Sequence, residues 1–181
     1  MPTGRHLAAL IGPVLMAMSA SAPGAEVPAL GTGYASGLWR FPDMRASGVI
    51  VTITPDQPAW WLQIPPRAVR FELGLARVYP QNDGVDAISF GPVWEFRRDV
   101  LGQVGFIDVG TAPTLLSERR IGERDLGSRY HFTSHLAAGL HLGRKRGWTV
   151  LGRIQHTSNA GIADPNPGFD DVARPQLAMR A

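Results

Sequence analysis

Apolar and polar side chains alternate with a period of two along most of this chain, and the segment 130–142 is the clearest case. One face carries Tyr130, Phe132, Leu136, Ala138, Leu140 and Leu142, and the other carries His131, Thr133, His135, Ala137, Gly139 and His141. Alternation of this kind is typical of a β-strand and not of a helix. The pattern predicts eight strands, at 31–40, 45–54, 66–79, 86–97, 104–116, 130–142, 148–158 and 171–181. The polar segment 117–127 is expected to be an exposed loop.

Two all-β architectures fit this alternation, and they differ in which face points inward. A soluble, lipocalin-like barrel would bury the apolar face, whereas an outer-membrane barrel turns that face to lipid. The polar faces mix Gly and Ala with Arg, Glu and His, which suits a narrow eight-stranded interior. Most Trp and Tyr residues lie near strand ends, as in interfacial girdles. We therefore expect an all-β, eight-stranded antiparallel transmembrane β-barrel of the outer-membrane type, and Pro175 is expected to disturb its last strand.

The first 25 residues have the features of a secretory signal peptide. Arg5 precedes an apolar run at 7–18, and small residues follow at 19–25. The predicted domain organisation is a signal peptide at 1–25 and one barrel at 26–181. The chain has no cysteine, which excludes disulfides and thiol nucleophiles. Only 18% of its residues are charged, and they form no basic tract, so a nucleic-acid partner is not expected.

Candidate chemistry lies at the end of the seventh predicted strand. His156 and Ser158 are two residues apart, so in a strand both point to the same face. An imidazole beside a hydroxyl is the core of an activated serine nucleophile, and a third group must orient the base. Asp170 and Asp171 follow the next loop, and either could reach the His156 ring from the adjacent strand. A histidine and a serine without chemistry at a membrane interface would give the same short pattern.

Two further groups of residues could take part in chemistry. Asn159 and Asn166 offer amide donors for an oxyanion. His131, His135 and His141 share the face opposite to the apolar one, where they could hold a metal or simply fill the barrel interior.

The longer motif resembles that of the lipid A 3-O-deacylase (PagL) family. The motif runs His156-Thr157-Ser158-Asn159-Ala160-Gly161-Ile162, then Pro165-Asn166, with an acid fourteen residues after the histidine; Ser89-Phe90-Gly91-Pro92-Val93 is also similar. The resemblance implies an enzyme of the outer membrane, a carboxylic ester hydrolase that removes the acyl chain from the 3-position of lipid A. It implies that His156 is the general base, Ser158 the nucleophile and Asp170 the orienting acid, in place of a family glutamate. It also implies that Asn159 and Asn166 belong to the oxyanion hole.

These implications extend to partners. The expected partners are lipopolysaccharide, through its lipid A, and membrane lipid, with no metal or other cofactor; a homodimer stays open. Acyl chain is expected against Trp148, Val150 and Ile154, and lipid A phosphates against arginines such as Arg144, Arg146 or Arg153. Two other functions remain as alternatives: a non-catalytic outer-membrane barrel, adhesin or structural, and a periplasmic barrel that binds an apolar ligand.

Overall fold

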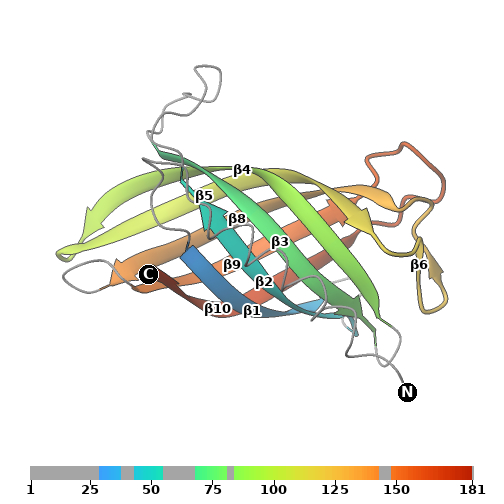
Figure 1. Ribbon diagram of the computed structural model, residues 1–181, viewed down its shortest axis with the longest axis horizontal. Coiled ribbons are helices and arrows are strands. Elements are labelled where there is room, and N and C mark those ends of the chain that lie inside the picture. The colour runs from blue at the N-terminus through green and yellow to red at the C-terminus, as the bar shows by residue number, and fades with distance from the viewer. Residues whose placement is uncertain (1–28, 38–42, 55–67, 81–83, 143–147, 181) are drawn as a thin grey trace, which may run out of the picture.

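The computed structural model describes residues 29–37, 43–54, 68–80, 84–142 and 148–180. Eight antiparallel strands close into a barrel in the order β1-β10-β9-β8-β5-β4-β3-β2 (Figure 1). Their bounds are β1 Ala29–Gly37, β2 Arg45–Ile53, β3 Ala68–Tyr79, β4 Val85–Val100, β5 Gln103–Leu116, β8 Tyr130–Leu142, β9 Trp148–Ser158 and β10 Phe169–Arg180. The eight-stranded antiparallel prediction is confirmed, and β8 and β9 have the predicted bounds. The predicted signal peptide lies outside the described residues.

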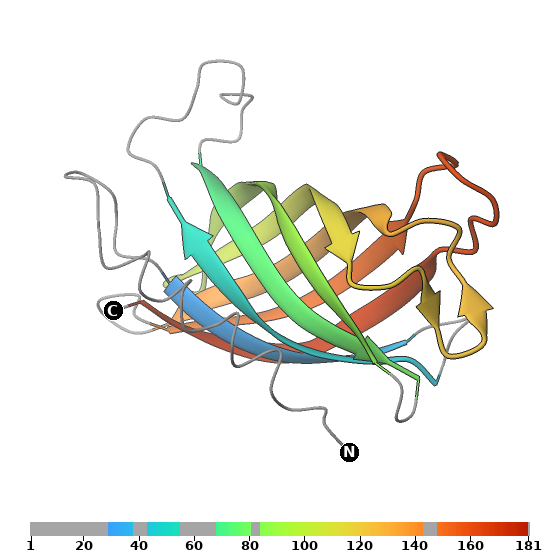
Figure 2. The ribbon, with the colours of Figure 1, turned by 45° about the vertical axis from the view of Figure 1, so that its right-hand side comes forward.

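The segment between β5 and β8 is not a plain loop. It contains two short strands, β6 Arg120–Ile121 and β7 Arg124–Asp125, which pair as a small hairpin. The side chains of Ile121 and Leu126 are almost fully buried, which anchors this polar segment to the barrel end. Figures 1 and 2 show that this hairpin and the loop between β9 and β10 project from the same end of the barrel.

Apolar side chains cover the outside of the barrel. Phe90, Leu136 and Ile154 are 49%, 48% and 47% exposed, although each is large and apolar. Their strand neighbours of opposite parity, such as Ala137 and Arg153, are buried inside. A soluble barrel rarely exposes so much contiguous apolar surface, so the lipocalin-like alternative is wrong for this chain. Among the described residues, no helix has the length and apolar character to cross a membrane.

Ion pairs fill much of the barrel interior. The Arg70 guanidinium lies 3.0 Å from the carboxylate of Glu72, 2.7 Å from that of Glu95 and 2.6 Å from that of Asp108. Arg153 extends the network, because its Nη2 donates to Glu72 at 2.7 Å. Buried charges are tolerated only when they are paired in this way. This part of the barrel interior is therefore filled by paired charges.

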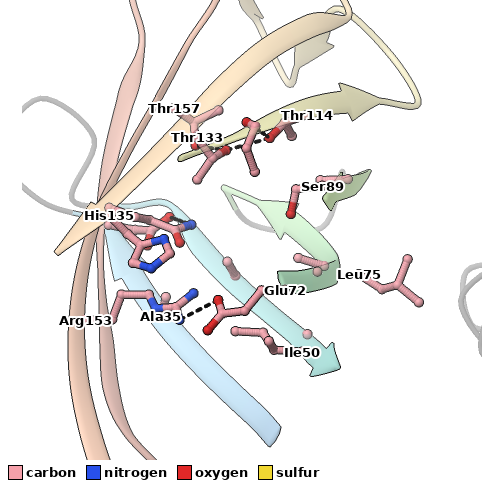
Figure 3. A pocket seen from close by; sticks show the side chains of 18 of the residues that line it. Ala35, Ile50, Glu72, Leu75, Ser89, Thr114, Thr133, His135, Arg153 and Thr157 are labelled. Carbon is pink, nitrogen blue, oxygen red and sulfur yellow. Dashed lines mark hydrogen bonds and ion pairs between the residues drawn. The ribbon is translucent and has the colours of Figure 1, made fainter. Parts of the chain in front are cut away.

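A row of threonines crosses the inner wall beside this network. Thr133 Oγ1 lies 2.8 Å from Thr114 Oγ1 and 2.9 Å from Thr157 Oγ1, which links β5, β8 and β9 by side-chain hydrogen bonds. Figure 3 shows this row and the Arg153–Glu72 pair around one interior cavity. The wall that carries the end of β9 is thus braced from inside.

Pro175 disturbs the last strand but does not prevent closure. The register of β10 shifts between Ala173 and Gln176 against β9, and against β1 it shifts between Thr32 and Ala35. Proline has no N–H to donate to a ladder, and a bulge is where a sheet accommodates it. On both sides of the shift, β10 pairs with its two neighbours, so the ring is complete.

Candidate functional site

The ends of β9 and β10 bring a histidine and a carboxylate together on the outer wall. His156 and Asp170 are direct cross-strand partners, and His156 Nδ1 lies 2.7 Å from Asp170 Oδ1. The side chains are 54% and 27% exposed. Asp170 is one methylene shorter than glutamate, but in directly opposed positions its carboxylate spans the gap of about 5 Å between strands.

The neighbouring carboxylate points the other way. Asp171 is buried in the barrel interior, where its Oδ2 accepts a hydrogen bond from Gln155 Nε2 at 3.1 Å. Successive strand residues point to opposite faces, so only one of the two acids can meet the histidine. The geometry brings Asp170, and not Asp171, to His156.

Two hydroxyl groups share the outer face with His156. Ser158 lies two residues further along β9 and is half-buried. Ser134 of β8 is the direct cross-strand partner of His156, and its Oγ lies 3.2 Å from Thr111 Oγ1 of β5. Sequence reasoning missed Ser134, because only the strand register places it beside the histidine.

The loop between β9 and β10 is organised by Asn159. This residue is fully buried, and its Nδ2 donates to the carbonyls of Leu126 at 3.0 Å, Ala163 at 2.8 Å and Pro165 at 3.2 Å. Its Oδ1 accepts from Gly161 N at 2.9 Å. An amide engaged in this way has no donor left for a reacting oxygen. The expectation that Asn159 itself supplies an oxyanion donor is therefore corrected: the side chain clamps the loop.

Asn166 is placed differently, on the exposed part of the same loop. Its Oδ1 accepts the backbone N–H of Asn159 at 3.1 Å, which turns the Nδ2 end of the amide away from that backbone. An amide held by its oxygen is a fixed donor. The Nδ2 group of Asn166 takes no part in that bond, and the role of Asn166 in the oxyanion hole stays a prediction.

The β6–β7 hairpin supports this loop from the side. Asn159 reaches the carbonyl of Leu126, which directly follows β7. Gly127 has φ +75°, and a Cβ there would lie 2.2 Å from the carbonyl oxygen of Pro165. A glycine is required at this close approach. The loop that carries Asn166 is thus packed against the hairpin.

A shallow groove on the outer wall runs away from the histidine. It is lined mainly by apolar side chains, with hydroxyls and the His156–Asp170 pair at one side: Trp94, Val109, Thr111, Ser134, Leu136, Ile154, His156 and Asp170 are among its residues. The groove crosses five neighbouring strands, from β4 to β10. It offers an apolar chain a place directly beside an imidazole and the hydroxyls of Thr111 and Ser134, whereas Ser158 is not among its lining residues.

The arginines expected to face phosphate are not confirmed. Arg153 points into the barrel interior, where it pairs with Glu72, so its expected role is wrong. Parity could have shown this, because residue 153 is an odd number of positions from His156. Arg144 and Arg146 lie outside the described residues.

The three inward histidines are well separated along β8. His141 Nδ1 lies 2.9 Å from Thr149 Oγ1, and its ring stacks on Phe106 with centroids 4.6 Å apart. His135 lies against Gly110, and His131 is almost fully buried near the other end of the strand. In the part of the chain that the structure describes, no cluster of three or more His, Asp or Glu side chains is arranged to hold a metal ion.

Fold and site together define an all-β barrel with an apolar exterior and a His–Asp pair beside serine hydroxyls on its outer wall. The family model of lipid A 3-O-deacylase (PagL) matches residues 49–173, a range that contains every residue of the candidate site. The chain belongs to the lipid A 3-O-deacylase (PagL) family.

Relatives and a solved structure agree with this family. "Lipid A deacylase PagL" of Pseudomonas aeruginosa is 36% identical over 95 residues, which is 51% of this chain and 53% of that protein. "Lipid A deacylase PagL" of Bordetella bronchiseptica is 34% identical over 89 residues, 46% of this chain and 49% of that protein. The chain thus spans about half the length of the curated relatives it matches. A crystal structure of the outer membrane enzyme PagL shares the fold, with a TM-score of 0.65 and 22% identity over 86% of this chain and 99% of that one.

Proposed function

We propose that this protein is a lipid A 3-O-deacylase of the outer membrane, a serine-type esterase that hydrolyses the acyl ester at the 3-position of lipid A. The observation that carries the proposal is the His156–Asp170 pair at 2.7 Å on an apolar outer wall, with Ser158 on the same face. An ionisable His–Asp pair facing lipid is costly, so its presence there favours a function at the membrane. Membership of the deacylase family supports the reaction type.

The proposed mechanism uses side chains alone. His156 Nε2 takes the proton of Ser158 Oγ, which attacks the acyl carbonyl. Asp170 accepts the hydrogen bond from Nδ1–H and stabilises the imidazolium that forms. The tetrahedral oxyanion is stabilised by the Nδ2 amide of Asn166, while Asn159 holds that loop.

The second half of the reaction restores the enzyme. The imidazolium of His156 returns its proton to the sugar oxygen, which leaves, and the acyl group stays on Ser158. Water, deprotonated by His156, then attacks the carbonyl of the acyl-enzyme. The bond from this carbonyl to Ser158 Oγ breaks, His156 returns the proton to Oγ, and a 3-hydroxy fatty acid leaves. Every proton moves through the imidazole, and no step in this scheme calls on a metal or a cofactor.

The position of the His156–Asp170 pair on the outer barrel wall supports a reaction at the membrane. The barrel strands have 9 to 16 residues, which is long enough to cross a bilayer, since a tilted strand needs roughly 9–11 residues. His156 is near the loop end of β9, where a membrane strand meets the headgroups and where the ester bonds of a glycolipid lie. The groove that includes Leu136 and Ile154 takes the acyl chain without removing it from lipid.

The test compares the two serines that flank His156. Purified protein in detergent micelles is incubated with lipid A, and the released 3-hydroxy fatty acid is quantified. We expect Ser158→Ala to abolish release, while Ser134→Ala keeps the nucleophile and loses less than about tenfold. Loss in Ser134→Ala with retention in Ser158→Ala would reassign the nucleophile, and no release by the unaltered, folded protein would overturn the proposed function.

A further inference from the structure

One residue of the β9–β10 loop lies so close to both members of the proposed His–Ser pair that a side chain there would meet them. Gly168 directly precedes β10 and is buried, with φ +56°. A Cβ built at this position would lie 2.9 Å from His156 Cε1 and 3.3 Å from Ser158 Cβ. Carbon atoms in good contact are about 3.5–4.0 Å apart, so the first distance is a clash and the second is tight. The backbone of Gly168 thus lies beside the imidazole, and a side chain at this position would force the ring or the loop to shift.

The atom nearest to an added Cβ at Gly168 is His156 Cε1, and its position affects both ring nitrogens. Cε1 is bonded to both ring nitrogens of His156. Nδ1 is held by Asp170 at 2.7 Å, and Nε2 is the nitrogen that must face the serine. A displacement of Cε1 therefore also moves both nitrogens and changes how they face Asp170 and Ser158. Sub-ångström changes of this kind matter, because a misplacement of about 1 Å can cost a reaction roughly 10²-fold in rate.

We propose that Gly168 is a positioning residue for His156 and Ser158, which sets the orientation of the imidazole by close backbone packing. The inference rests on the proposed function, since it assumes that these two residues do the chemistry. It goes beyond the His, Ser and acid motif, because Gly168 in the β9–β10 loop adds a second constraint on the orientation of the His156 imidazole. The hydrogen bond to Asp170 fixes one ring nitrogen, and Gly168 limits rotation about that bond.

A glycine with positive φ also has a purely conformational explanation, and the chain offers controls that separate the two. Gly161 in the same loop has φ +77°, and Gly102 between β4 and β5 has φ +76°. A Cβ at either position meets nothing within 4 Å. Alanine at these two sites introduces only the strain of a left-handed backbone. Alanine at Gly168 introduces the same strain and, in addition, a clash with the imidazole.

The experiment compares Gly168→Ala with Gly161→Ala and Gly102→Ala in the full-length protein. Folding is checked by heat-modifiable gel migration and by thermal unfolding in detergent. Steady-state deacylation gives kcat and KM, and labelling by a fluorophosphonate probe reports the reactivity of Ser158 without lipid A. We expect similar melting temperatures for the three variants. For Gly168→Ala alone we expect roughly a 10²-fold loss in kcat and in labelling rate, with KM within about twofold.

A second substitution keeps the test decisive if Gly168→Ala folds poorly. Asparagine tolerates the left-handed region better than alanine, so Gly168→Asn relieves the backbone strain and keeps the offending Cβ. The same loss of kcat in folded Gly168→Asn supports the proposal. Activity and labelling equal to those of Gly161→Ala would overturn it. Failure of the proposed function is distinct: the unaltered protein would then neither label at Ser158 nor release fatty acid.

Discussion

The bond between Asp170 and His156 gives the sharpest prediction about rate. Asp170→Asn removes the negative charge and keeps the size of the side chain. At 2.7 Å, Coulomb's law gives about 1.5 kcal/mol in water-like surroundings and about 6 kcal/mol at an effective dielectric constant of 20. His156 is 54% exposed, so the lower part of this range applies, about 2–4 kcal/mol of transition-state stabilisation. That corresponds to roughly a 30- to 1000-fold loss in kcat.

The same substitution should leave stability nearly unchanged. Ion pairs with this exposure contribute about 0–1 kcal/mol to folding, and solvent screening places this pair at the low end. A large kinetic effect with a small stability effect distinguishes an orienting acid from a structural pair. The assay is steady-state release of fatty acid, with urea unfolding in lipid vesicles measured in parallel.

Asp171→Asn is the matched control, since Asp171 lies next in sequence and faces the barrel interior. We expect its kcat to stay within about threefold of the unaltered protein. If Asp171→Asn lost activity and Asp170→Asn kept it, the reasoning from register and parity would be refuted.

Two further predictions concern the loop clamp and the barrel interior. Asn159→Asp replaces a donor to three carbonyls by an acceptor, so we expect the loop to lose about 1–3 kcal/mol of local stability, seen as faster hydrogen exchange at residues 159–168. Asn166→Asp keeps the acceptor for the Asn159 N–H and loses only the donor, so kcat should fall about 10²-fold while hydrogen exchange stays unchanged. Faster exchange in Asn166→Asp, with unchanged exchange in Asn159→Asp, would contradict the role of Asn159 as the loop clamp. Arg70→Met leaves three interior carboxylates without their shared partner, so we expect the free energy of unfolding in urea to fall by about 3–5 kcal/mol. Adding Asp108→Leu should recover part of this loss. An unchanged urea midpoint in Arg70→Met would show that the cluster is not stabilising.

Much of the barrel could be predicted from period-two alternation alone. The predicted bounds of β8 and β9 match the structure, because each strand has large apolar residues on one face and small or polar ones on the other. The same pattern predicted that the apolar face of each strand points outward, because charged residues such as Arg70 and Glu72 have to pair inside a narrow interior. Pro175 predicted an irregularity in the last strand. Whether the barrel still closes could not be predicted, because closure depends on how both neighbouring strands pair with β10.

The details of the candidate site depend on register, which a single chain does not encode locally. Asp170 and Asp171 lie 14 and 15 positions after His156, too similar to separate them by sequence distance, and the pairing of β10 with β9 decides between them. Ser134 is 22 positions before His156 and is brought beside it by β8. Asn159 fits an oxyanion donor and a loop clamp equally well by residue type, and its burial and partners favour the clamp.

Mass spectrometry of lipid A from a Gram-negative host that expresses this protein tests the central claim most directly. The unaltered protein and Ser158→Ala are compared after both are shown to be folded in the outer membrane. We expect the loss of one 3-hydroxyacyl mass from the 3-position with the unaltered protein and intact lipid A with Ser158→Ala. Intact lipid A in both strains, or the same loss in both, would contradict it.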